Sequence, residues 1–253
     1  MNPITAALLI AFADAASEGT VAPPLPALLA RVDQLYAHRD EPSAWSEEQR
    51  LVSTVLQQAP SDYDVLWRAA RVFFWLSDDP AVAGAERSKW GKQGWDLAER
   101  AVTARPNDVA GHYYAAICMG NYALGLGIMK ALSMGLEGKF KERLKRAGEL
   151  DARYDHGSIS LAWGGFYDKL PWPKRDRAKA QQHMLHALAI NPHSLRARVF
   201  LAGSLMNSDR PRDAKTLLDE VAGAPVGRYD APEERRAKQL GAALMPQLLA
   251  KLK

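Results

Sequence analysis

The chain has 253 residues, of which 47% are hydrophobic and 25% charged, and its formal net charge is +4. This composition is typical of a folded domain and excludes a disordered or collagen-like chain. The single cysteine, Cys118, excludes an intrachain disulfide framework and a multi-cysteine metal site.

The amino-terminal segment is apolar from Ile4 to Phe12 and is followed by Ala13-Asp14-Ala15, the small-x-small form that signal peptidase accepts. No Lys or Arg precedes this short run. Two interpretations stay open. Residues 1–16 are a cleaved signal peptide of a periplasmic protein, or they belong to the first helix of a cytoplasmic one.

A recurring spacing organises the rest of the chain. Four clusters of small and apolar residues share intervals of four, three and five positions: Gly94-Ala98-Ala101-Pro106, Phe140-Leu144-Ala147-Ala152, Ala180-Met184-Ala187-Pro192 and Ala214-Leu218-Val221-Val226. The first residues of these clusters are 46, 40 and 34 positions apart, and 34 is the period of the tetratricopeptide repeat, a pair of antiparallel helices. Small residues let the two helices approach closely, and proline ends the second helix. The pattern predicts an all-α, tetratricopeptide-like right-handed helical solenoid.

We expect one helical-repeat domain over residues 24–253 that ends in a capping helix. The predicted helix pairs cover 24–60, 62–106, 108–152, 157–192 and 195–225, and the cap covers 231–252. The first pair repeats the spacing as Glu48-Val52-Val55-Pro60 but is degenerate. Its first helix lacks the small residue that recurs as Ala70, Ala116, Ala162 and Ala202. Pro246 is expected to kink or split the cap.

No combination of residues predicts catalysis. The six histidines are scattered, and His183 and His186 have no third ligand at metal-binding spacing. Gly120, Gly125 and Gly127 do not follow a strand and do not form a phosphate loop. Acidic residues interrupt both basic stretches, and no nucleic-acid recognition module accompanies them. We predict a non-enzymatic protein with no metal, no cofactor and no nucleic-acid partner.

The first helix of each pair lines the concave face of a tetratricopeptide solenoid. If the four recurring alanines mark the contact between paired helices, the side chains turned toward this face are mainly aromatic and aliphatic. They are Trp67, Arg71, Phe74, Tyr113, Ile117, Ile159, Trp163, Phe166 and Met206. Such a groove suits a hydrophobic small molecule, with Arg71 available for an acidic head group. The alternative is that a terminal helix fills the groove as core.

Several stretches carry a resemblance to a known family. They are "DVLWRAARVFFWLS", "GWDLAERAVTARPND", "GHYYAAICMG", "GLGIMKAL", "RAGELDARYDHGSISLAWGGFYDKLPW" and "AKAQQHMLHALAINP". In this order they resemble the tetratricopeptide T-component family of tripartite ATP-independent periplasmic (TRAP) transporters, although the chain has no lipobox cysteine. The resemblance implies a periplasmic binding or adaptor protein that works beside a solute-binding subunit, forms homo-oligomers and handles hydrophobic ligands. A similar repeat arrangement occurs in the regulator of microtubule dynamics family. A cytosolic tetratricopeptide scaffold for protein–protein interaction is therefore the alternative function.

Overall fold

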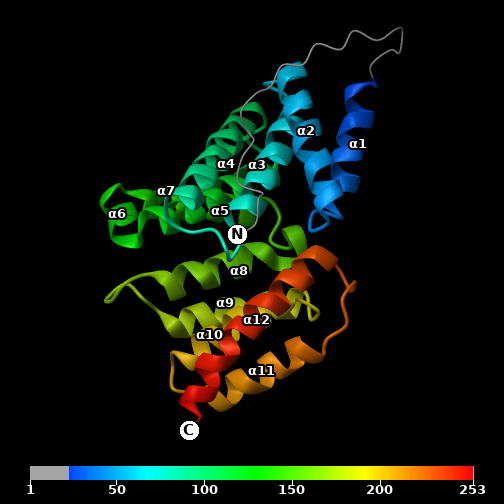
Figure 1. Cartoon of the computed structure of the whole chain (residues 1–253). Helices are drawn as coiled ribbons and strands as arrows, with labels where there is room; N and C mark the ends of the chain where they lie inside the picture. Colours follow the sequence, from blue (N-terminus) through cyan, green and yellow to red (C-terminus); the bar gives the residue numbers. More distant parts are fainter. Residues whose placement is uncertain (1–22, 253) are drawn as a thin grey trace.

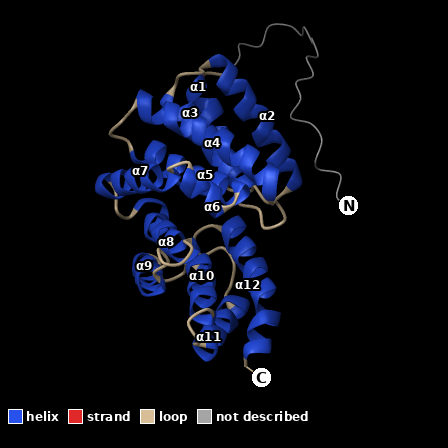
Figure 2. Cartoon of the chain, turned by 90° about the vertical axis from the view of Figure 1, so that its left-hand side faces the viewer, coloured by secondary structure: helices blue, strands red, loops and turns tan. Residues whose placement is uncertain are grey.

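The computed structural model describes residues 23–252, and within that range every regular element is a helix (Figures 1 and 2). The prediction of an all-α helical-repeat fold is confirmed. The predicted signal peptide, residues 1–16, lies outside the described residues. The helices are α1 (Leu25–Tyr36), α2 (Pro42–Gln58), α3 (Tyr63–Ser77), α4 (Gly84–Ala104), α5 (Val109–Leu126), α6 (Ile128–Ser133), α7 (Leu136–Leu150), α8 (Tyr154–Lys169), α9 (Arg177–Ile190), α10 (Leu195–Met206), α11 (Pro211–Gly223) and α12 (Ala231–Lys251).

Short polar side chains begin several of these helices. The Asp62 carboxylate accepts from the amides of Asp64 and Val65, and Asp230 accepts from the Glu233 amide. A carboxylate at this position satisfies amides that have no partner inside the helix and complements the positive end of the helix dipole. Local sequence therefore fixes where the first helix of the second pair and the cap begin.

Small residues let paired helices approach closely. Ala70, Ala98 and Ala101 are fully buried. A Cβ atom added to Gly94 would lie 3.3 Å from the Ala70 carbonyl oxygen of its paired helix α3 and 2.6 Å from Cys118 Sγ of the next helix α5, so α4 passes directly against both. On α8, however, the contact residue is Gly164, whose added Cβ would lie 2.8 Å from the Met184 side chain.

The extra residues of the third repeat form the short helix α6. The turns on either side contain Gly127 and Gly135, with φ angles of 90° and 71° that side-chain-bearing residues rarely adopt. Both views place α1–α7 on one side of α8 and α9–α12 on the other (Figures 1 and 2).

The cap α12 folds back along the last repeat. Its buried Ala237 and Leu248 pack with α10 and α11, and the helix continues through Pro246 without being split. The start of α12 reaches the turn between α1 and α2, because Arg39 and Asp40 pair with Asp230 and Arg235. The two ends of the repeat array are thus joined by ion pairs.

Candidate binding cavity

A cavity of about 540 Å3 lies where the first helices of the repeats face the start of α12. Its wall is formed by one face of α3 and α5, by α6 and the start of α7, by α8, and by the 229–233 segment. This volume is within the range of roughly 300–1,000 Å3 that is usual for ligand pockets. The array therefore keeps a hollow on its inner side.

A connected cluster of aromatic rings forms part of this wall. Trp67 stacks on Tyr114 with ring centroids 6.1 Å apart, and Tyr113 meets Tyr114 edge-on at 5.1 Å. Tyr154 extends the cluster at 5.2 Å from Tyr113. Burial raises the pKa of Tyr113 and Tyr114 well above the usual value, so their hydroxyls stay neutral at physiological pH. This aromatic part of the wall is uncharged.

Six of the nine side chains predicted for the groove lie on the cavity wall. They are Trp67, Arg71, Phe74, Tyr113, Ile117 and Phe166. The other three, Ile159, Trp163 and Met206, lie elsewhere.

The register of α8 explains two of these three placements. With Gly164 at the contact with α9, the cavity-facing stripe of α8 contains Ser158, Ala162, Gly165 and Lys169. Trp163 is turned away and stacks on Tyr167 and His183, and Ile159 packs toward α7 near Gly148. Ala162 therefore faces the cavity and is not the helix contact that the repeat spacing predicted. The prediction chose the wrong residue because glycine and alanine are both small enough for a helix crossing, so the spacing could not distinguish Ala162 from Gly164.

Met206 is excluded by the cap. The concave side of α10 is covered by α12, where an added Cβ on Gly241 would lie 3.5 Å from Val199. Met206 is 4% exposed and belongs to the core cluster that α12 completes. A terminal helix thus fills the last part of the groove, while the part lined by α3, α5 and α8 remains hollow.

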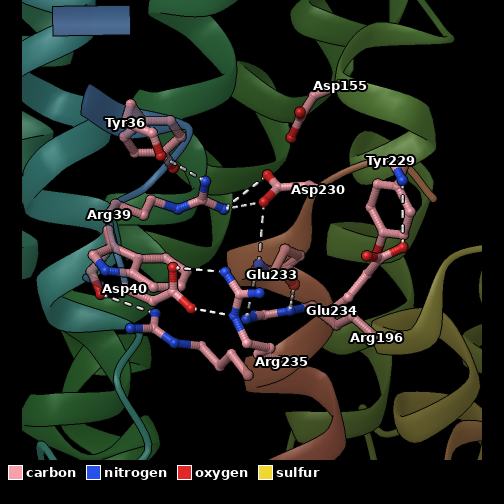
Figure 3. Close-up of polar contacts among 12 residues, drawn as sticks. Tyr36, Arg39, Asp40, Asp155, Arg196, Tyr229, Asp230, Glu233, Glu234 and Arg235 are labelled. Atoms are coloured by element: carbon pink, nitrogen blue, oxygen red, sulfur yellow. Dashed lines mark hydrogen bonds and ion pairs between the residues drawn. The ribbon is translucent and has the colours of Figure 1, made fainter. Parts of the chain in front are cut away.

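The arginines of the wall are paired with the protein's own carboxylates (Figure 3). Arg39 binds Asp230 through two contacts of 2.9 and 2.7 Å, and its guanidinium lies 4.1 Å from the centre of the Tyr36 ring. Arg71 pairs with Asp33 at 2.8 Å, and its guanidinium lies 3.8 Å from the centre of the same ring. These charges are therefore already compensated inside the protein.

A second ion-pair group links α10 and α12 to the end of α3. Arg196 contacts Asp78 at 2.7 Å and also binds Glu233. Arg236 donates to the Trp75 carbonyl at 3.0 Å. With Arg39–Asp230 and Asp40–Arg235, these contacts form what we call the clasp, which joins residues 39–40 and 75–78 to residues 196 and 230–236.

Glu234 holds the turn before α12 in shape. Its carboxylate is fully buried and accepts from the backbone amides of Gly227, Arg228 and Tyr229, the last two at 3.0 and 3.3 Å. Consecutive amides of a turn make a natural anion-binding concavity. The turn in this way positions the Tyr229 ring on the cavity wall.

The first turn of α8 contains a strained, non-helical stretch of backbone where it borders the cavity. Asp155, His156 and Gly157 have φ angles of 48°, 58° and 89°. Consecutive left-handed residues are costly for side-chain-bearing amino acids and persist only where the surroundings hold them. Gly157 is buried against Ile190, and the Asp155 carboxylate lies 3.5 Å from the Tyr113 hydroxyl.

The clasp and the turn that Glu234 holds were not predicted from the sequence. Arg39 and Asp230 are 191 positions apart, so no local spacing could connect them. Asp230 and Glu233 are residue types typical of a helix start, in agreement with the predicted cap over 231–252, but they carry no information on its contact with the first repeat.

Residues 23–252 contain no cluster of three or more metal-ligating side chains. Nor does any helix in that range have both the length and the apolar character needed to cross a membrane.

Comparison with known proteins identifies the family. The family model described as regulator of microtubule dynamics protein 1-3 matches residues 28–158, which is more than half of the chain. The chain belongs to this family. A tetratricopeptide repeat model matches residues 174–243 of this regulator of microtubule dynamics family member. No curated protein matches it, and none of the matches links it to TRAP transporters.

A solved structure shares the fold of this family member. It is the crystal structure of TTC0263, a thermophilic TPR protein in Thermus thermophilus, with a TM-score of 0.64 and 18% sequence identity over 87% of this chain and 98% of that chain. The tetratricopeptide-like solenoid is therefore established. Helical-repeat proteins of this kind are generally interaction scaffolds, and the cavity offers apolar contact and internally paired charges.

Proposed function

We propose that this protein is a non-enzymatic scaffold that receives side chains of a partner protein in its concave cavity. The observation that carries the proposal is the wall of aromatic rings around a hollow of about 540 Å3, on the face that repeat proteins use for their partners. The three arginines of this wall are paired with the protein's own carboxylates, so apolar contact supplies most of the affinity.

A photo-crosslinking amino acid placed at Phe166 tests this function. Phe166 lies on the cavity wall, whereas the control position Leu185 is 56% exposed on α9 and lies outside the wall. We expect a crosslinked polypeptide of defined mass from position 166 and none from position 185. Equal crosslinking at both positions would contradict a specific site.

Filling the cavity provides the second control. Gly120 and Gly165 are helical residues of the wall, and their added Cβ atoms would lie 3.4 and 3.6 Å from the nearest side chains, Phe140 and Phe200. Leucine at these positions would occupy the hollow, and loss of a helical glycine favours the helix by roughly 1 kcal/mol. The crosslink at Phe166 should disappear in the Gly120→Leu, Gly165→Leu variant while its melting temperature is kept. Persistence of the crosslink would mean that the partner binds elsewhere.

The second candidate function is the binding of a small apolar molecule in the same cavity. Its volume and aromatic lining favour this function. Native mass spectrometry of the protein as purified from its source should then show an added small mass that the Gly120→Leu, Gly165→Leu variant lacks. A single mass equal to that of the polypeptide would contradict this candidate.

A more specific version of the proposal is that the protein is exported to the periplasm and associates with a transporter. The motive is the amino-terminal sequence and the order of motifs shared with the TRAP T-component family. Amino-terminal sequencing of the mature protein should then begin near Ala16 or Ser17. A retained Met1 would favour a cytoplasmic scaffold. Light scattering with and without the solute-binding subunit would test whether the protein forms homo-oligomers and whether it binds that subunit.

A further inference from the structure

One face of the molecule exposes large apolar side chains. Seven such side chains are exposed among residues 23–252, and four of them belong to the last turn of α5, to the α5–α7 connection or to the loop between α8 and α9. They are Leu124, Met129, Met134 and Trp172, with exposed fractions of 38%, 70%, 47% and 87%. Single exposed apolar side chains are normal, but this concentration on one face needs an explanation.

The two segments are neighbours in space. Lys174, two residues after Trp172, forms an ion pair with Glu137, three residues after Met134. Both segments project at the left-hand edge of Figure 1, the side that is turned toward the viewer in Figure 2. We define residues 124–141 and 168–179 as the docking face.

The docking face also carries an excess of positive charge. It contains eight Lys and Arg residues against three Asp and Glu residues, whereas the whole chain has a net charge of only +4. Two of the acids are occupied, since Glu137 pairs with Lys141 and Lys174 and Asp176 caps the start of α9. Six of the basic residues form no ion pair within the described part of the chain: Lys130, Lys139, Lys169, Arg175, Arg177 and Lys179.

We propose that the docking face binds the surface of an anionic lipid bilayer. Trp172, in the α8–α9 loop, and Met129, on α6, would enter the interfacial region, where an indole ring is favoured. The surrounding lysines would remain at the level of the acidic head groups, each contributing attraction that falls off within a Debye length. The inference does not depend on what the cavity binds.

The apolar side chains favour a bilayer over a nucleic acid. A phosphate backbone would use the basic residues alone and would leave Met129 and Met134 exposed to water. A bilayer interface uses both kinds of side chain, and combines weak apolar insertion with charge. A nucleic acid is therefore the alternative that the experiment must separate.

Co-flotation of the full chain with vesicles tests the proposal. One set is pure phosphatidylcholine, and the other contains about a third phosphatidylglycerol, which supplies the anionic surface. We expect binding to the anionic vesicles only, with loss of binding at about 0.5 M salt because the Debye length then falls to a few ångströms. A fluorescent single-stranded oligonucleotide is measured in parallel.

Two variants locate the binding face. Lys130→Glu, Lys139→Glu reverses two charges that no ion pair uses, and should weaken vesicle binding at least about twentyfold, since one basic residue is worth about fivefold at such a surface. Trp172→Ser removes an 87% exposed side chain and should weaken binding without changing the melting temperature. The control variant Lys215→Glu, Lys251→Glu makes the same change in net charge on α11 and α12, at the bottom of Figure 1.

If the control and the Lys130→Glu, Lys139→Glu variant lose vesicle binding equally, the effect depends on net charge alone, and the assigned face is overturned. Equal binding to both kinds of vesicle would overturn the role of charge. Absence of vesicle binding, with or without oligonucleotide binding, would overturn the proposal itself.

Discussion

The carboxyl group of Glu48 should make the stability of this protein depend on pH. Glu48 lies on α2 and is 0% exposed, and neither of its carboxylate oxygens has a hydrogen-bond partner among residues 23–252. Burial raises its pKa from 4.5 to about 7, although the nearby guanidinium groups of Arg71 and Arg39 oppose the shift and Asp33 adds to it. The folded protein therefore holds a proton on Glu48 that the unfolded chain releases.

The sign and size of the effect follow from this difference. Between pH 4.5 and about 7 the folded state binds more protons at this site than the unfolded state, so the free energy of unfolding falls as pH rises. The full shift corresponds to about 3 kcal/mol. For a chain of this length that is a difference of roughly 6 to 12 °C in melting temperature.

The variant Glu48→Gln keeps the shape of the side chain and cannot ionise. Melting temperatures of wild type and variant should be measured from pH 4 to pH 8, with the exposed Glu142→Gln as control. The difference between Glu48→Gln and wild type should grow in favour of the variant as pH rises, whereas the control should show no such trend. Parallel profiles for wild type and Glu48→Gln would refute the argument, because the buried carboxyl would then not titrate on unfolding.

Further substitutions test the packing and the clasp by denaturant unfolding. Ala101→Trp should cost roughly 1–3 kcal/mol or more by overpacking a fully buried helix crossing, and an unchanged midpoint would show that the repeat register is wrong. Asp230→Ala should cost about 3 kcal/mol because it leaves the buried guanidinium of Arg39 unpaired; the double variant with Arg39→Gln should recover part of the loss, and simple additivity would falsify the pairing. Gly91→Ala should cost roughly 1–3 kcal/mol, because its Cβ would lie 2.5 Å from the backbone of α5. Gly138→Ala, which meets nothing within 4 Å, should instead stabilise the helix by roughly 0.5–1 kcal/mol, and equal effects of the two alanines would argue against the close α4–α5 crossing.

Much of the fold could be predicted because its determinants are local. The interval of four, three and five positions places small residues on one face of each second helix, and these residues are buried in the structure, as Ala98 and Ala187 illustrate. Asp62 and Asp230 begin helices through contacts with amides two or three residues away. Such contacts depend on the helix period alone.

The candidate site was less predictable. On α3 and α5 the recurring alanine gave the correct face, so Trp67, Phe74 and Tyr113 lie on the cavity wall. On α8 the same rule selected Ala162, although Gly164 makes the closer crossing. Moving the contact residue by two positions changes which side chains of the helix face inward. Trp163 therefore faces α9.

The array of helix pairs and its apolar inner face are encoded locally, because side chains three, four and seven positions apart share one side of a helix. How the array ends depends instead on contacts between distant parts of the chain. The pairing of Arg39 with Asp230 joins residues 191 positions apart, and α12 covers α10 but leaves α3, α5 and α8 facing a hollow. These features depend on the summed rotation of successive helix pairs, which no single segment of the chain encodes.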